Sequence, residues 1–231
     1  MKIKMKNNLL FFLLSLSITA SAQSLEFNFG THLNNLYDFK EKNGPYTSSY
    51  SPKVGYDLNV GIDDIYLNTM RLRFTLGLSI YGGGIKASQG ENGGNYSMNG
   101  EIEKTVLRLG FYPVNFRIKK RLNINIGPQF SMLIHEKIKG TYDEWHVEYN
   151  EYNNQYIVES SGNLNERYDS YNARCYVGAN IRIAYRIPLS EDFYLVPQYA
   201  LYIGISNEFV EFPNITKSIN NMLGIGIKRK I

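Results

Sequence analysis

Apolar and polar residues alternate along much of the chain, most clearly in the stretch Met70–Tyr81. Its even-numbered residues are all apolar, whereas its odd-numbered residues include Arg71, Arg73 and Gly77. A period of two residues predicts a β-strand. The alternation alone does not say which face meets water, because a soluble sandwich buries its apolar face and a membrane barrel turns that face toward lipid.

The same period recurs in eight segments, and no segment of convincing length has the 3.6-residue period of a helix. The predicted strands are Leu25–Leu33, Lys53–Asp63, Met70–Tyr81, Thr105–Tyr112, Arg121–His135, Tyr171–Ile187, Phe193–Ile205 and Ile219–Lys228. The pattern therefore predicts an all-β protein.

The predicted connections alternate in length. Short turns are expected at Asp64–Thr69, Pro113–Lys120 and Pro188–Asp192, and long loops at Asn34–Pro52, Gly82–Gly100, Glu136–Ser170 and Ser206–Lys217. The glycine-rich stretch "GGGIKASQGENGG" within the second long loop is expected to be a flexible surface loop. An up-and-down meander would place all the short turns at one end and all the long loops at the other, which is the polarity of outer-membrane barrels.

Glycine positions favour a closed barrel over a sandwich. Ten glycines fall on the polar face of the predicted strands: Gly30, Gly55, Gly61, Gly77, Gly110, Gly127, Gly178, Gly204, Gly224 and Gly226. Eight strands leave an interior just wide enough for side chains to fill it, so large inward residues need small neighbours. A soluble barrel or sandwich whose polar face is open to water has no such need.

The N-terminus has the features of a cleaved export signal. Lys2, Lys4 and Lys6 precede the apolar run Leu9–Ile18, and Ala20-Ser21-Ala22 follows as a cleavage site. The run is too short to span a membrane as a helix. We therefore expect residues 1–22 to be removed and residues 23–231 to form a single barrel domain in a bacterial-type outer membrane.

Composition excludes several classes of function. After loss of the signal the chain carries 22 basic and 21 acidic residues, so no global positive charge suggests nucleic acid as a partner. Cys175 is the only cysteine, which excludes an intramolecular disulfide. The three histidines have no spacing that suits a metal ion, and nothing in the sequence points to a cofactor.

Charged residues on the predicted inner face suggest a polar network inside the barrel. Its predicted members are Glu26, Lys53, Asp57, Asp63, Arg71, Arg73, Arg108, Arg174, Arg182 and Arg186; Lys228 lies on the same face. Three inward acids cannot pair all the bases, so loop carboxylates, polar groups, water or bound anions must satisfy the rest. The network would either plug the lumen or line a small anion-favouring pore.

The third long loop is acidic and rich in aromatic residues. We expect it to continue the flanking strands outward as a hairpin or to be disordered. Exposed aromatics favour recognition, so a protein- or glycan-binding surface is the alternative, with candidate residues Tyr142, Trp145, Tyr149, Tyr152 and Tyr156.

The segment Leu107–Ile134, "LRLGFYPVNFRIKKRLNINIGPQFSMLI", carries a family resemblance. Its Tyr112-Pro113 strand end, basic turn Lys119–Arg121 and Gly127-Pro128 return strand resemble the outer-membrane β-barrel domain family that includes the PorT-like proteins. The resemblance implies an eight-stranded outer-membrane barrel, in a family mostly without known catalytic residues.

The sequence as a whole predicts an eight-stranded antiparallel up-and-down transmembrane β-barrel, monomeric and non-enzymatic, in contact with outer-membrane lipid. A surface-binding or membrane-organising role is expected. The alternatives are a small pore and a lipid-modifying enzyme that uses His135, which the alternation places on the same face as Ser131, with Glu136 next in sequence.

Overall fold

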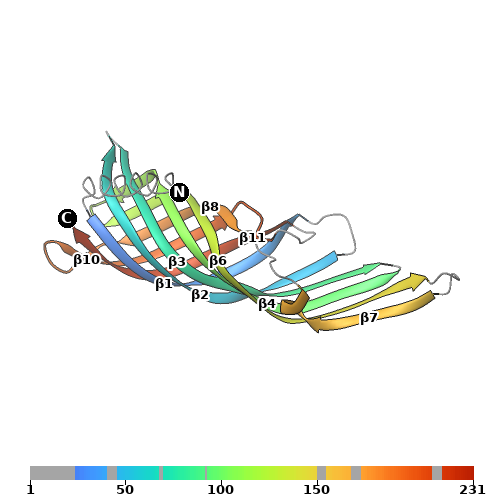
Figure 1. Ribbon diagram of the computed structural model, residues 1–231. Coiled ribbons are helices and arrows are strands. Elements are labelled where there is room, and N and C mark those ends of the chain that lie inside the picture. Colours follow the sequence, from blue (N-terminus) through green and yellow to red (C-terminus); the bar gives the residue numbers. More distant parts are fainter. Residues whose placement is uncertain are drawn as a thin grey trace, which may run out of the picture.

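The protein is described by a computed structural model that covers residues 24–40, 46–67, 70–91, 93–149, 155–167, 173–209 and 215–231. The predicted signal segment, residues 1–22, lies outside this part of the chain. Within it the chain is almost entirely antiparallel β-structure (Figure 1). The elements are β1 (Ser24–Lys40), β2 (Tyr46–Leu67), β3 (Met70–Glu91), β4 (Gly94–Tyr112), β5 (Val114–Ile118), β6 (Leu122–Tyr149), β7 (Gln155–Asn163), α2 (Leu164–Arg167), β8 (Cys175–Tyr185), β9 (Ile187–Pro188), β10 (Phe193–Gly204) and β11 (Ile215–Lys230).

Eight of these strands close into a ring. The order of pairing is β1, β2, β3, β4, β6, β8, β10 and β11, and β11 returns to pair with β1. Consecutive barrel strands are neighbours, so the topology is up-and-down, and the predicted eight-stranded antiparallel barrel is confirmed. Ring closure leaves these strands without an open edge inside the barrel.

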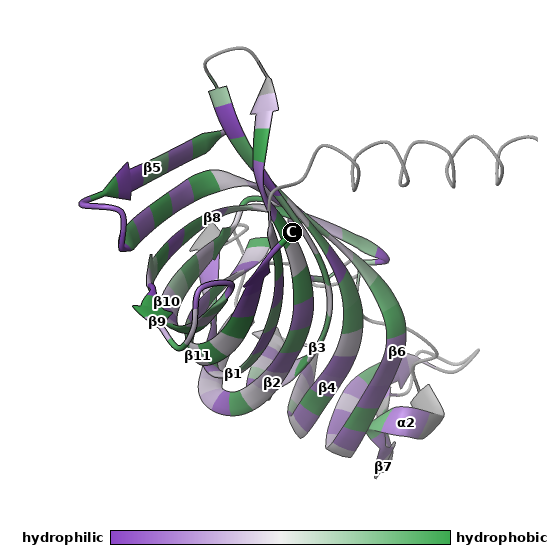
Figure 2. Cartoon of the chain, turned by 90° about the vertical axis from the view of Figure 1, so that its left-hand side faces the viewer, coloured by the Kyte–Doolittle hydropathy of each residue, from purple (hydrophilic) through white to green (hydrophobic). Residues whose placement is uncertain are grey.

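The barrel turns its apolar side chains outward. All eight barrel strands contribute exposed large apolar residues, among them Phe27, Phe29, Leu58, Leu76, Leu78, Leu109, Phe130, Met132, Ile183, Tyr199, Ile203, Leu223 and Ile225. Figure 2 shows the alternation of apolar and polar residues along the barrel strands. None of the described helices is long and apolar enough to cross a membrane.

Glycines on the inner face make room for large inward side chains. A Cβ at Gly61 would lie 2.5 Å from an amino group of Arg73, and a Cβ at Gly55 would overlap the ring of His32. At Gly178 the ring of Tyr202 occupies the corresponding space. The one-sided glycines of the sequence thus reflect close packing inside the lumen.

Beyond the barrel, several strands continue as an extended sheet that we call the blade. It consists of residues 46–52 of β2, 83–91 of β3, 94–102 of β4, 137–149 of β6, and β7, paired in that order. In Figure 1 it extends to the right of the barrel. The hairpin expected within the third long loop is present as the pair β6 and β7.

The glycine-rich loop prediction is wrong, because Gly82–Glu91 belongs to β3 and Gly94–Gly100 to β4. At Gly82 a Cβ would meet the carbonyl oxygen of Ile102, so the glycine permits close strand pairing where a flexible loop was expected. The prediction of a turn at Pro113–Lys120 is also too long. Most of that segment is β5, which pairs with β6 through a tight turn at Lys119 and Lys120, both with positive φ.

The blade has an apolar cluster of its own on one face. Leu36, Ile85, Ala87, Met98, Ile102, Leu164 and Phe209 are buried there, with Tyr50, Tyr96, Ile138 and Tyr142 packed against them. Phe209 ends the described residues 205–209 that follow β10, and these contact β4 through Glu208. This cluster fixes the base of the blade to the barrel.

Candidate functional site

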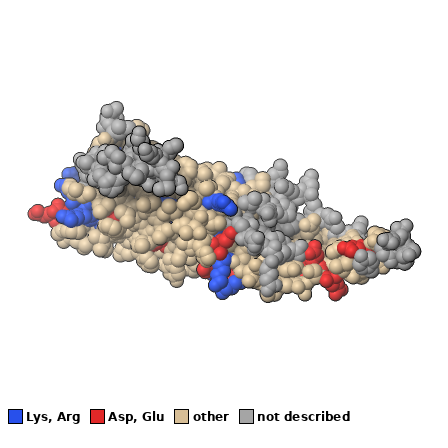
Figure 3. Space-filling view, in the orientation of Figure 1, with Lys and Arg blue, Asp and Glu red and all other residues tan. Residues whose placement is uncertain are grey.

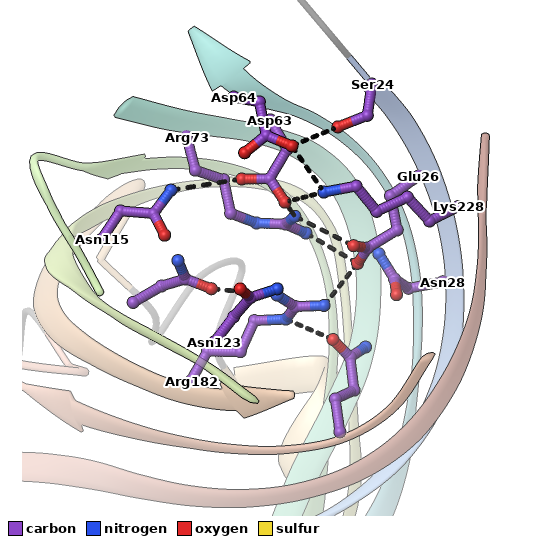
Figure 4. A network of polar contacts seen from close by, with 12 residues as sticks. Ser24, Glu26, Asn28, Asp63, Asp64, Arg73, Asn115, Asn123, Arg182 and Lys228 are labelled. Carbon is purple, nitrogen blue, oxygen red and sulfur yellow. Dashed lines mark hydrogen bonds and ion pairs between the residues drawn. The ribbon is translucent and has the colours of Figure 1, made fainter. Parts of the chain in front are cut away.

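The lumen is filled at its short-turn end by a buried cluster of charged residues, which we call the inner cluster. Arg73 bridges two carboxylates, donating to Glu26 at 2.9 Å and to Asp63 at 2.9 Å. Arg182 donates to the same Glu26, and Lys228 to the same Asp63 at 2.5 Å. All five side chains are buried (Figure 4). Such pairs lose most of their solvation and hold together because each charge meets several partners.

Asp63 and Asp64 are adjacent, yet both belong to this network. The register between β2 and β3 shifts between Ile62 and Ile65, and Asp64 has a φ of 62°, so a β-bulge turns both carboxylates inward. Asp64 accepts both hydrogen bonds from Arg117 Nη2, at 2.7 and 2.9 Å, and also contacts Arg71. The bulge therefore supplies a carboxylate that strict alternation would have placed outside.

A second buried ion pair lies near the long-loop end of the lumen. Lys104 donates to Glu208 at 2.7 Å, and both side chains are essentially inaccessible. The ammonium group also lies over the rings of Tyr176 at 4.8 Å and Phe209 at 5.0 Å from their centres. Glu208 lies shortly after β10, so this charge pair links the end of β10 to β4 across the lumen in an aromatic setting.

Between the two clusters the lumen holds a cavity of only about 40 Å³. Arg73, Arg108 and Arg182 line it, together with side-chain amides and the ring of Tyr202. Arg108 is held by Asp57 at 2.7 Å. A volume of this size has room for only a few water molecules, so side chains occupy most of the described lumen between the two clusters.

The structure brings together most of the predicted lumen residues but places two elsewhere. Glu26, Asp63, Arg71, Arg73, Arg182 and Arg186 meet in or beside the inner cluster, and Asp57 pairs with Arg108 farther along the lumen. Lys53 instead reaches the exposed Glu101 at 3.3 Å, because the register of β2 shifts as it leaves the barrel. Arg174 is exposed in a bend before β8, where the strand alternation has not yet begun.

The expected placement of His135 beside Ser131 on the inner face is wrong. Ser131 is buried, whereas His135 is exposed, because a bulge opposite Thr105 and Val106 reverses the faces of β6 between them. The buried histidine is His32, whose Nε2 lies 3.4 Å from Ser79 Oγ and whose Nδ1 lies 3.9 Å from Asp57. The latter distance is too long for a hydrogen bond, and the Ser79 hydroxyl is enclosed.

The predicted loop aromatics divide between the two faces of the blade. Trp145 and Tyr149 are exposed on one face, at 39% and 62%. Tyr142 packs against the apolar cluster on the other face. It is an odd number of residues from Trp145 and Tyr149, and side chains at odd spacing along a strand point to opposite faces. Tyr152 lies outside the described residues, as does the side chain of Tyr156.

Sequence reasoning missed several members of the network. Asp64 and Arg117 fell in predicted turns, and Lys104 and Glu208 were not assigned to the lumen. The sequence did contain a sign of Asp64. The predicted inward-facing bases outnumbered the inward-facing acids, so at least one further carboxylate was needed. Lys104 lies one residue outside the predicted strand Thr105–Tyr112, which begins eleven residues after the start of β4 at Gly94. Among the described residues, no group of three His, Cys, Asp or Glu side chains is placed to hold a metal ion.

No family model matches the sequence, and no curated protein matches it. Among solved structures the chain is similar to the attachment invasion locus protein Ail of Yersinia pestis (11% identity, TM-score 0.38, covering 90% of this chain and 99% of that chain). It is also similar to Neisserial surface protein A (10%, 0.42, 91% and 98%) and to OprG of Pseudomonas aeruginosa (12%, 0.45, 91% and 98%). These TM-scores are low, so the barrel assignment rests on the strand pairing of the chain itself, and the PorT-like resemblance stays a prediction.

Proposed function

We propose that this protein is an integral outer-membrane β-barrel that anchors the blade at the cell surface for recognition of an external partner. The observation that carries the proposal is the apolar outer surface of the barrel, to which all eight ring strands contribute. Contiguous exposed apolar surface beyond a few hundred Å² is unusual on a soluble monomer. A hydrocarbon environment accounts for it, because lipid solvates these side chains and the closed ring satisfies the backbone.

The position of the blade supports an outward-facing role. Ser24 at the start of β1 pairs with Lys230 near the end of β11, so both ends of the barrel domain lie at the short-turn end. The blade lies at the opposite end (Figure 1). In outer-membrane barrels the short turns face the periplasm and the long connections face outward. This orientation exposes the blade to molecules outside the cell.

The plugged lumen supports an anchoring role over conduction. Two buried charge clusters, separated by a cavity of about 40 Å³, occupy the described part of the lumen. A small anion-favouring pore would require both clusters to open. In planar bilayers we therefore expect no stepwise conductance from the purified protein, and steady channels would contradict a closed lumen.

Membrane fractionation tests the proposal as a whole. We expect the protein in the outer-membrane fraction, with a gel mobility that changes after boiling, because folded barrels resist detergent. Protease added to intact cells should cut the blade and leave the barrel, since only the blade would be outside. Recovery of the protein in the soluble fraction would overturn the assignment.

A lipid-modifying activity is not favoured by the placement of the histidines. His135 is separated from Ser131 by a bulge that puts the two on opposite faces of β6, and Ser79 beside His32 is fully buried. We propose a non-enzymatic role. A change in lipid A mass on deletion of the gene, absent on complementation but persisting with His32→Ala or His135→Ala, would refute it.

A further inference from the structure

The face of the blade opposite its apolar cluster is largely polar, with Tyr149 and Ile157 exposed at its outer end. Short hydroxyl, amide and carboxylate side chains cover most of it, and an exposed tryptophan stands among them. Next to Tyr149 and Ile157, toward the barrel, lies the part that we call the polar face: Asn95, Ser97, Asp143, Trp145, Glu159 and Ser161.

Strand register arranges these six residues in two rows. Asn95 of β4, Trp145 of β6 and Glu159 of β7 lie opposite one another in the first row. Ser97, Asp143 and Ser161 form the second row, two residues along each strand. Strands in a sheet lie about 4.8 Å apart and alternate side chains about 7 Å apart. The donors and acceptors are thus spread over a surface larger than one sugar ring.

The surface is hollowed along these rows. The six residues, together with Glu144 and Ser160, line a hollow of about 410 Å³. A second hollow of about 360 Å³ shares Ser97 and Asp143 and continues across β3 and β2 toward Lys86 and Thr47. Together the two hollows run across the strands, and an extended ligand would lie along them.

The polar face is held rigidly from behind. Residues that alternate with it, such as Met98 on β4 and Tyr142 on β6, pack into the apolar cluster. A Cβ at Gly162 would lie 3.2 Å from the ring of Tyr142, which covers that glycine on the reverse side. Rigid support lowers the entropic cost of binding, because the side chains that meet a ligand stand on fixed strands.

We propose that this face binds a neutral glycan chain, a proposal that rests on the blade lying outside the cell. Sugar rings present apolar C–H faces edged by hydroxyl groups. The indole of Trp145 offers an electron-rich face for the C–H groups, while amides, hydroxyls and carboxylates exchange hydrogen bonds with the sugar hydroxyls. Asp143 and Glu159 flank the indole, so a sulfated or phosphorylated glycan would meet like charge there. Figure 3 shows acidic side chains on the visible part of the blade.

Fluorescence provides a direct test, because Trp145 is the only tryptophan of the chain. The full-length protein in detergent micelles would be titrated with maltohexaose, cellohexaose, laminarihexaose and mannohexaose, and with a heparin oligosaccharide as the charged comparison. We expect at least one neutral oligosaccharide to shift the Trp145 emission and protect it from acrylamide quenching in a saturable manner. The heparin oligosaccharide should do neither.

Variants that retain Trp145 identify the site. Asp143→Ala and Glu159→Ala each remove a sugar partner and should weaken binding at least about fivefold, as expected for a lost hydrogen bond to a charged group. His146→Ala, on the reverse face next to Trp145 in sequence, is the matched control and should leave affinity unchanged. Trp145→Ala, followed by calorimetry, should abolish binding while the heat-modifiable gel mobility stays intact.

The outcomes separate this inference from the proposed function. If none of the four neutral oligosaccharides binds, the inference is overturned, and so it is if the heparin oligosaccharide binds with equal affinity. If instead a protein partner binds and Trp145→Ala abolishes that binding, the surface role survives and the glycan assignment fails. If the blade is inaccessible to protease on intact cells, the proposed function itself fails.

Discussion

The barrel and the blade are built from the same strands but bury opposite faces of them. On β3, Leu76 and Leu78 are exposed on the outer face of the barrel, whereas Ser79 points into the lumen. A few residues farther along, Lys86 occupies the outer face of the blade and Ile85 is buried on the inner one. The strand keeps its alternation of faces, but the apolar side chains change from one face to the other.

This exchange shows that the surroundings of a sheet, and not its pairing, decide which face is apolar. Inside the ring the inner face is enclosed and filled with ion pairs, and the apolar outer face suits the lipid surroundings proposed for the barrel. In the blade the ring has opened, so the inner face collapses onto an apolar cluster and the outer face meets water. The apolar side chains of β3 change from the outer to the inner face between Tyr81 and Ile85, and there β3 would leave the membrane.

The largest expected effect comes from breaking the inner cluster. Arg73→Met leaves Glu26 and Asp63 without their shared guanidinium, and we expect a loss of about 3–5 kcal/mol in the free energy of unfolding. The urea midpoint of the gel-mobility shift measures it. Lys53→Met breaks an exposed pair with Glu101 and should cost less than about 1 kcal/mol. Equal losses in the two variants would show that the lumen charges are not buried.

Placing an arginine on the outer face of β3 at two depths tests the exchange of faces directly. Leu78→Arg puts a charge on the outer face of the barrel and should cost about 2–4 kcal/mol near the bilayer midplane. Ser88→Arg puts the same charge on the outer face of the blade and should change stability by less than about 0.5 kcal/mol. Both values can be measured by refolding the variants into lipid vesicles at a series of urea concentrations. A similar cost at both positions would contradict a membrane boundary between them.

Truncating the apolar cluster should loosen the blade and leave the barrel intact. Ile102 is 1% exposed, and Ile102→Ala should cost about 2 kcal/mol, toward the low end for a buried isoleucine because the cluster is small. Limited proteolysis should then cut the blade faster at unchanged barrel mobility on gels. Val114→Ala, at an exposed position on β5, is the control. Loss of barrel mobility in Ile102→Ala would show that the two regions fold as one unit.

The smallest effect concerns pH. Tyr50 donates to Asp38 at 2.8 Å and lies 3.0 Å from Thr216, which ties the base of the blade to β1 and β11. Burial raises the pKa of Tyr50 to about 12. An unfolded tyrosine loses its proton near pH 10, so between about pH 10 and 12 the folded state binds more protons than the unfolded state. Stability contributed by Tyr50 should therefore fall over this interval.

Urea unfolding followed by Trp145 fluorescence between pH 9 and pH 12 measures this dependence. Tyr50→Phe should flatten it, because the substituted ring has no proton to lose. A profile identical to that of the unsubstituted chain would show that other groups cause the decline.

The sequence alone predicted the eight barrel strands, the closed ring and its polarity, but not the continuation of the strands into the blade. Period-two alternation is a local property of the chain and predicts single strands. The one-sided glycines and the alternating loop lengths then indicated that these strands close into a barrel. Local patterns could not reveal the bulges that turn Asp64 inward and His135 outward, because a bulge arises from the register of two strands.

Only the tertiary structure decided which side chains meet. The pairing of Lys104 with Glu208 joins residues 104 positions apart across the lumen, and the polar face of the blade exists only because β4, β6 and β7 align Asn95, Trp145 and Glu159 in one row. Such meetings depend on ring closure and strand register, which are long-range properties. The residue types were visible in the sequence, and their arrangement followed from the fold.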